Sequence, residues 1–145
     1  MKQVFFALLI IILVTSCKKS SDSSLSCSLT EANIIGNFRI TGLVRRLNPL
    51  SENIDLFSSY PACQKDDVIQ FMANGTYKYI DAGTRCSPYD SQPDPWSIIG
   101  ANQMHFDGEL FTVKSFDCNT LVIYKIDAPQ INTNPGAVTT LTLSK

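Results

Sequence analysis

Tight-turn signals at short intervals constrain this chain more than any other feature of its sequence. Asn74-Gly75, Asp107-Gly108 and Asp117-Cys118-Asn119 each separate two short runs rich in β-branched and aromatic residues. Asn-Gly and Asp-Gly favour two-residue hairpins, because such turns need positive φ at both central residues. Strands this short, joined by turns this tight, are typical of an all-β sandwich or barrel.

Eight strand segments are expected. They span 34–47, 67–72, 76–81, 96–99, 103–106, 109–116, 120–126 and 137–144. In the first segment, alternation is expected to place Phe38, Ile40, Gly42 and Val44 on one face. Hairpin follows hairpin with little room for Greek-key crossings, so we predict an eight-stranded antiparallel up-and-down barrel. An open two-sheet sandwich is the alternative.

The first sixteen residues indicate a leader. An apolar run over Val4–Val14 is too short for a transmembrane helix of ~20 residues and matches the core of a signal peptide. The run Leu13-Val14-Thr15-Ser16-Cys17 resembles the lipobox of bacterial lipoproteins. That resemblance implies cleavage before Cys17 and acyl chains on Cys17, which would attach the protein to a membrane. An ordinary secretory signal beside a structural cysteine is the alternative.

The expected organisation follows from this leader. It comprises a lipoprotein signal peptide at 1–16, the lipidated Cys17 with a polar, flexible tether at 17–30, and a barrel domain at 31–145. Lys18 stands where an inner-membrane retention Asp would be, so the resemblance favours the outer membrane. Both the periplasmic and the cell-surface side remain open.

Several short motifs carry a family resemblance. Gly36-Asn37-Phe38 is similar to the Gly-x-Trp opening of lipocalins, with Phe in place of Trp. The acids after Cys63 and the Phe71–Tyr77 hairpin resemble the lipocalin-like domain of Bacteroidota outer-membrane lipoproteins. Trp96-Ser97-Ile98 and the run over 119–123 are similar to further strands of that family. The resemblance implies a barrel fold and a location in the cell envelope, and the family has no agreed substrate.

Four cysteines remain after Cys17, and they allow three disulfide connectivities. The hairpin of 67–72 and 76–81 brings its two open ends together, so a Cys63–Cys86 disulfide is expected. That pairing leaves Cys27 for Cys118. Spacing typical of a metal site is absent, because no C-x-x-C pair occurs.

Charge and catalytic motifs exclude several functions. Twelve Lys and Arg balance 13 Asp and Glu, so nucleic acid is not expected as a partner. His105 is the only histidine, and it has no second ligand or triad partner nearby in the sequence. Asp66 and Asp67 are expected to point to opposite faces of a strand. We therefore predict no enzyme activity, no catalytic residue, no metal and no cofactor.

Aromatic residues are the candidates for a binding site. They either line a ligand cavity or fill the core, and the set is Phe38, Phe71, Tyr77, Trp96, Phe106 and Tyr124. The predicted function is a non-catalytic binding module for a small apolar or amphipathic ligand. The alternative is a filled barrel that presents its loops to an envelope or host protein. The loops 47–61 and 82–94 are expected at opposite rims, and the oligomeric state is left open.

Overall fold

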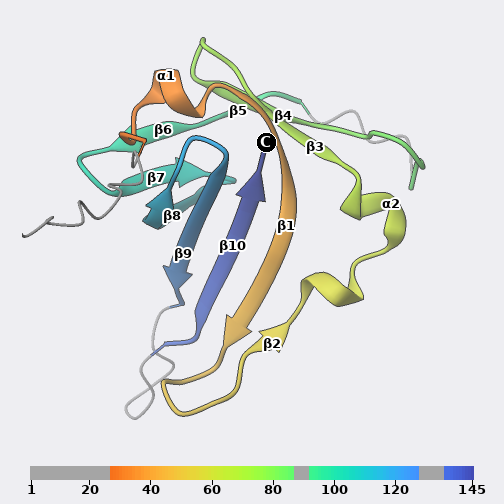
Figure 1. The fold of residues 1–145 in the computed structure, drawn as a ribbon, viewed down its shortest axis with the longest axis vertical. Helices are drawn as coiled ribbons and strands as arrows, with labels where there is room; N and C mark the ends of the chain where they lie inside the picture. Colours follow the sequence, from red (N-terminus) through yellow and green to blue (C-terminus); the bar gives the residue numbers. More distant parts are fainter. Residues whose placement is uncertain (1–26, 87–91, 128–135) are drawn as a thin grey trace, which may run out of the picture.

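The computed structural model describes residues 27–86, 92–127 and 136–145, which form a nearly closed antiparallel β-barrel (Figure 1). The expected signal peptide, Cys17 and most of the tether lie outside the described residues. Within the described ranges, the helices are all too short and too polar to cross a lipid bilayer.

The elements are short, as the spacing of turn signals predicts. The strands are β1 (Gly36–Arg46), β2 (Ile54–Asp55), β3 (Val68–Phe71), β4 (Thr76–Ile80), β5 (Asp94–Pro95), β6 (Ser97–Ile99), β7 (Gln103–Phe106), β8 (Glu109–Phe116), β9 (Thr120–Ile126) and β10 (Val138–Ser144). Helices α1 (Glu31–Ile34) and α2 (Ala62–Lys65) and a 3-10 turn at Phe57–Ser59 accompany them. The strand order β5-β4-β3-β1-β10-β9-β8-β7-β6 confirms the all-β up-and-down barrel.

The barrel closes through a segment that changes partners at Trp96. β5 pairs with β4, β6 pairs with β7, and Trp96 alone separates them. The Trp96 backbone N–H donates to the Gly75 carbonyl at 2.9 Å, and its indole N–H donates to the Thr76 carbonyl at 3.0 Å. The strand expected at 96–99 therefore begins two residues earlier and serves both neighbours. The sequence did not predict β2, which pairs with the end of β1.

The turn chemistry matches the two-residue prediction at Asp107-Gly108. The expectation of such a turn at Asn74-Gly75 is wrong, because the loop there comprises residues 73–75 and, of Asn74 and Gly75, only Gly75 has a positive φ. Asp107 and Gly108 have φ values of 55° and 71°, the left-handed conformations that a two-residue hairpin requires. In the other hairpin, the Asn74 side-chain oxygen accepts from the Thr76 backbone N–H at 3.1 Å and from its hydroxyl at 2.8 Å. These turns fix the register of β3 against β4 and of β7 against β8.

A β-bulge reverses the face pattern of β1. The register of β1 against β10 shifts between Ile40 and Gly42, which leaves Thr41 as the extra residue. Residues after the bulge therefore alternate in the opposite sense from those before it. The expectation that Gly42 and Val44 share a face with Phe38 and Ile40 is wrong, because it assumed an unbroken alternation.

Aromatic rings fill the barrel next to α1. The Phe71 ring lies at the centre, with its centroid 5.6 Å from Phe38, 5.1 Å from Trp96 and 5.4 Å from Phe106. The Tyr77 ring centroid is 4.6 Å from that of Phe106. Pairs at these spacings stabilise a core beyond their buried area. This end of the barrel interior is solid.

Helix α1 covers that end of the barrel (Figure 1). The Thr30 side chain accepts a hydrogen bond from the Asn33 backbone N–H, so it caps the helix. Ile34 is fully buried in the core. The Lys145 ammonium donates to the Asn33 carbonyl at 2.9 Å and ties the helix to the residue after β10.

Two disulfides connect the loops to the barrel. Cys27, just before α1, is bonded to Cys118 in the β8–β9 turn, with a Cα–Cα distance of 5.2 Å. Cys63 is bonded to Cys86 near the open ends of β3 and β4, with a Cα–Cα distance of 5.3 Å. The Cys63–Cys86 bond is the one that the hairpin geometry predicts, and Cys27–Cys118 is the pairing that this prediction leaves.

Removing the disulfides singly is expected to destabilise the fold unequally. The bridges span 91 and 23 residues, and loop-closure entropy gives about 4.6 and about 3.4 kcal/mol for loops of these lengths. The double variant Cys27→Ser/Cys118→Ser should therefore lose about 1 kcal/mol more of the free energy of unfolding than Cys63→Ser/Cys86→Ser. Urea unfolding followed by Trp96 fluorescence measures both. Equal losses, or the reverse order, would contradict this account.

Candidate functional site

The barrel interior opens at the end away from α1. The pocket there has a volume of about 420 Å³ and is called the mouth pocket below. It is lined by Ile40, Tyr60, Gln64, Asp67, Ile69, Tyr79, Asp81, Cys86 and Asp107. Its volume falls within the ~300–1,000 Å³ range of small-molecule sites.

Strand alternation turns apolar side chains into the mouth pocket. Ile69 on β3 is 1% exposed and lies in register with Tyr79 on β4. Ile40 precedes the bulge, so it keeps the inward orientation of Phe38. The Tyr79 ring centroid is 5.8 Å from the Tyr77 ring of the core. The floor of the pocket therefore continues the aromatic core.

Three carboxylates line the mouth pocket. Asp67 directly precedes β3 and Asp81 directly follows β4, so the ladder places them opposite each other at the open end of the hairpin. Asp107, in the β7–β8 turn, accepts a hydrogen bond from the Tyr77 hydroxyl at 3.1 Å. Burial and the nearby Asp107 raise the pKa of Tyr77, so this phenol remains a donor at neutral pH.

The facing carboxylates are incompletely paired. Partial burial raises the pKa of Asp67, the carboxylates of Asp81 and Asp66 add to this, and a hydrogen bond from the Ala82 backbone opposes it. One carboxylate oxygen of Asp67 and one of Asp81 are buried without a hydrogen-bond partner among the described residues. A buried acceptor without a partner costs free energy, which a bound cation or N–H donor would recover.

The structure brings together five of the six predicted aromatic residues. They are at most 3% exposed and pack as one core cluster: Phe38, Phe71, Tyr77, Trp96 and Phe106. These rings fill the interior, and only Tyr77 reaches toward the mouth pocket, through its bond to Asp107. Tyr124 lies apart from them, because β9 turns Ile123 inward and Tyr124 outward.

Sequence reasoning missed the pairing of Asp67 with Asp81. It considered Asp67 only beside Asp66, whose side chain accepts a hydrogen bond from the Thr84 backbone at 3.0 Å. The Asn74-Gly75 turn was the available signal. A three-residue loop over 73–75 places residue 72 opposite residue 76, and counting outward from that loop places residue 67 opposite residue 81.

The expectation that loops 47–61 and 82–94 form opposite rims is wrong. Tyr60 from the first loop and Cys86 from the second both line the mouth pocket. The Cys63–Cys86 disulfide explains this arrangement, since it holds the two loops at the same end of the barrel.

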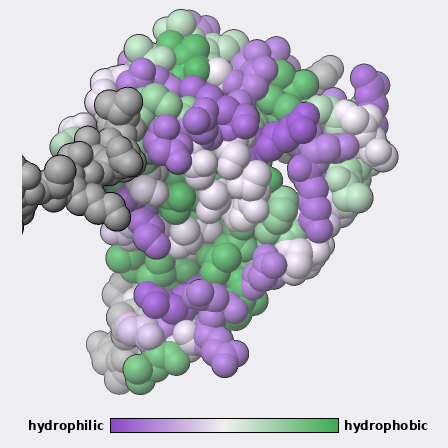
Figure 2. Space-filling view, viewed as in Figure 1, coloured by the Kyte–Doolittle hydropathy of each residue, from purple (hydrophilic) through white to green (hydrophobic). Residues whose placement is uncertain are grey.

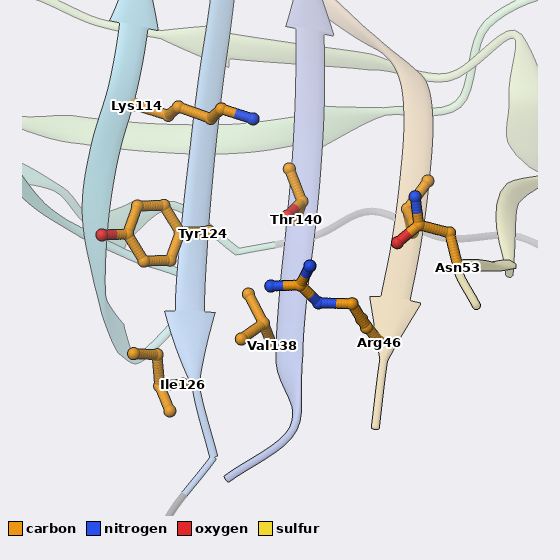
Figure 3. A pocket seen from close by; sticks show the side chains of 8 residues that line it. Arg46, Asn53, Lys114, Tyr124, Ile126, Val138 and Thr140 are labelled. Carbon is orange, nitrogen blue, oxygen red and sulfur yellow. The ribbon is translucent and has the colours of Figure 1, made fainter. Parts of the chain in front are cut away.

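A second hollow lies on the outer face of the sheet (Figure 3). It spans β8, β9, β10 and β1, has a volume of about 670 Å³, and is called the outer trough below. It is lined by Val44, Arg46, Asn53, Lys114, Tyr124, Ile126, Val138 and Thr140. The outer trough and the barrel interior therefore lie on opposite faces of the same strands.

Neither a metal site nor a similar known protein points to a function for this chain. Over residues 27–86, 92–127 and 136–145, no three His, Cys, Asp or Glu side chains are grouped closely enough to hold a metal ion. No family model, curated protein or solved structure matches the chain. The mouth pocket and the outer trough are therefore the candidate sites of this chain.

The variant Asp67→Asn is expected to stabilise the fold at neutral pH. The pKa of Asp67 is raised above its ordinary value of 3.8, so ionisation of Asp67 opposes folding. That penalty is absent below the unfolded-state pKa and is complete above the folded-state pKa. The free energy of unfolding should rise at pH ~7 and stay unchanged near pH ~3.

Urea unfolding at the two pH values measures this difference. Glu52→Gln, in the exposed loop after β1, is the control for loss of one negative charge. A destabilised Asp67→Asn protein at neutral pH would show that the carboxylate has a favourable partner, contrary to the repulsion inferred above.

Proposed function

We propose that this chain is a non-catalytic lipoprotein of the bacterial envelope, whose barrel binds a small amphipathic ligand in the mouth pocket. The lipobox-like run ending at Cys17 supports a lipid anchor, and Lys18 supports the outer membrane. The two disulfides suit an oxidising compartment outside the cytoplasm. The resemblance to lipocalin-like envelope lipoproteins agrees with this location.

The mouth pocket is the observation that carries the binding function. Its floor of Ile40, Ile69 and Tyr79 suits the apolar part of a ligand. Asp67 and Asp81 suit a positively charged group, because a cation would relieve their mutual repulsion and pair their unpartnered oxygens. The ligand class proposed is therefore an amphipathic cation, such as an alkyl amine.

The same residues favour binding over catalysis. Asp67 and Asp81 lie on the inner face beside apolar side chains, and the pocket's described lining contains no histidine, lysine or serine. Carboxylates that face each other supply charge complementarity, whereas nucleophilic catalysis needs a nucleophile next to its base. The proposal therefore assigns no reaction to the pocket.

A protein-interaction role is the second candidate. In the connection between β1 and β2, Leu47 is 50% exposed and Leu50 is 97% exposed, and Ile54 at the start of β2 is 43% exposed. Neighbouring exposed apolar residues of this kind are a feature of protein-binding surfaces. In this alternative the solid core is a scaffold, and the loops contact another envelope protein or a host protein.

A matched ligand titration tests the binding proposal. All described strands and both disulfides lie within 27–145, so the chain from residue 18 on contains the whole fold. Calorimetric titration with decylammonium, below its micelle concentration, should give saturable binding. Asp67→Asn/Asp81→Asn should weaken that binding about tenfold or more, since each lost charge-assisted contact contributes roughly 1.5–3 kcal/mol.

A control variant distinguishes the loss of the mouth pocket's carboxylates from a general loss of negative charge. Glu31→Gln/Glu52→Gln removes two acids outside the mouth pocket and should leave the affinity unchanged. Affinity should increase as the pH rises through the raised pKa of Asp67, because only the ionised carboxylate attracts the cation. No binding, together with no co-purified small molecule in native mass spectrometry, would favour the protein-interaction candidate.

The lipid anchor has its own test. In the bacterium that makes the protein, Cys17→Ser should move the chain from the membrane fraction to the soluble fraction or leave it unprocessed. Ser16→Ala keeps a small residue before Cys17, so it should leave the chain in the membrane fraction. Fractionation and the intact mass of the mature chain measure both variants. An unmodified Cys17 in the wild-type protein would overturn the anchor.

A further inference from the structure

The outer trough presents an apolar floor on a face that normally meets water. Val138 and Thr140 of β10 lie beside Tyr124 and Ile126 of β9, and Ile126 is 62% exposed. Figure 2 shows apolar side chains gathered on this face, over the lower part of the strands, with hydrophilic side chains beside them. An apolar floor with a polar border is a feature of ligand-binding surfaces.

Two cationic side chains reach into the outer trough. Lys114 extends from β8 across β9, and Arg46 extends from β1 across β10. Their charged groups lie at different levels along the strands, with Thr140 between those levels (Figure 3). Like charges that line one hollow repel each other, and an anion bound between them would relieve that repulsion. The two residues come from strands at opposite sides of the trough.

Neither cation has an ion-pair partner among the described residues. Arg45 pairs with Asp127 at 2.8 Å and Lys125 pairs with Glu109 at 3.0 Å, but these four residues belong to the inner alternation of their strands. On the outer face, the described lining of the trough contains no acid.

One acid lies beside the lining of the trough. Asp55 of β2 is paired with Val44, and its carboxylate keeps its charge while it accepts a hydrogen bond from the Ser58 backbone at 3.0 Å. This single charge is outnumbered by those of Arg46 and Lys114. The charge of the outer trough is therefore positive, in a chain with a formal net charge of −1.

We propose that the outer trough is a second binding site, specific for an amphipathic carboxylate. The carboxylate lies between Arg46 and Lys114, where the guanidinium supplies paired donors and the ammonium a point charge. The apolar body lies on Val138, Tyr124 and Ile126. The volume of about 670 Å³ fits a small molecule of this kind.

A free molecule fits this site better than a membrane surface. The chain enters the barrel at Cys27, which is bonded to Cys118 at the start of β9, whereas Ile126 lies at the other end of that strand. Seven residues of β-strand span roughly 20 Å. The outer trough therefore lies about that far from the point at which the chain enters the barrel, and it is a hollow, which suits a single molecule better than a flat membrane surface.

Calorimetric titration with decanoate, below its micelle concentration, tests the second site. The chain from residue 18 on should bind decanoate, and Arg46→Gln/Lys114→Gln should weaken binding about tenfold or more. Arg39→Gln/Lys78→Gln removes the same charge from strands β1 and β4 outside the trough and should keep the wild-type affinity. Urea unfolding of both double variants checks that the fold is retained.

Two further results bear on the proposal. Decyltrimethylammonium should not displace decanoate, because it lacks the anionic group. Anionic phospholipid vesicles should not sediment the chain from residue 18 on. Absence of decanoate binding, equal weakening by the Arg39→Gln/Lys78→Gln control, or displacement by the cation would overturn the carboxylate site. Sedimentation that depends on Arg46 and Lys114 would overturn the choice of a free ligand over a membrane.

Discussion

The pairing of β1 with β10 is the constraint on which the rest of the structure depends. It joins strands from the two ends of the domain through residue pairs from Arg39–Ser144 to Arg46–Val138. Because both edges of the meander meet there, the sheet curls into a barrel and has an inside and an outside. The bulge at Thr41 is the adjustment that lets β1 stay paired along its length while its inward residues continue to meet the core.

The same bulge determines which charges meet the interior. It turns Arg45 inward, where Asp127 neutralises it, and leaves Arg46 outside. One sheet thus separates two hollows of opposite character: carboxylates at the barrel mouth and cations in the outer trough. The aromatic core next to α1 is solid, and the two hollows lie at the open end and on the outer surface.

Local chemistry made most of the fold predictable, and long-range pairing accounts for the rest. The turns at Asn74-Gly75 and Asp107-Gly108 allowed the four strand ends beside them to be predicted within a residue or two of their observed positions. The reason is that the backbone requirements of a turn are local. The bulge at Thr41 has no such marker, since it arises from the fit between strands about a hundred residues apart. Tyr124 was assigned to the core set because β9 is apolar on both faces, which removes the period-two signal.

The candidate site was less predictable than the fold. A pocket needs side chains from several strands to converge, and single-strand alternation cannot specify that convergence. The sequence could have predicted that Asp67 and Asp81 face each other, because both belong to one hairpin. It could not have predicted that Arg46 and Lys114 line one trough. That prediction requires the order of four strands and the change of face at the bulge. The filled core was one of two outcomes that the aromatic content allowed.

Closure by β10 also imposes an order of events on folding. β1 is complete in the chain long before its partner, and the loop that must close between them is nearly the length of the domain. Contacts so distant in sequence slow folding, since chain entropy is lost before the strands gain their hydrogen bonds. During that interval β1 is an open edge, and the kink at its bulge makes it a poor template for pairing with a second chain. The residue that shapes the barrel is therefore also a safeguard against aggregation during folding.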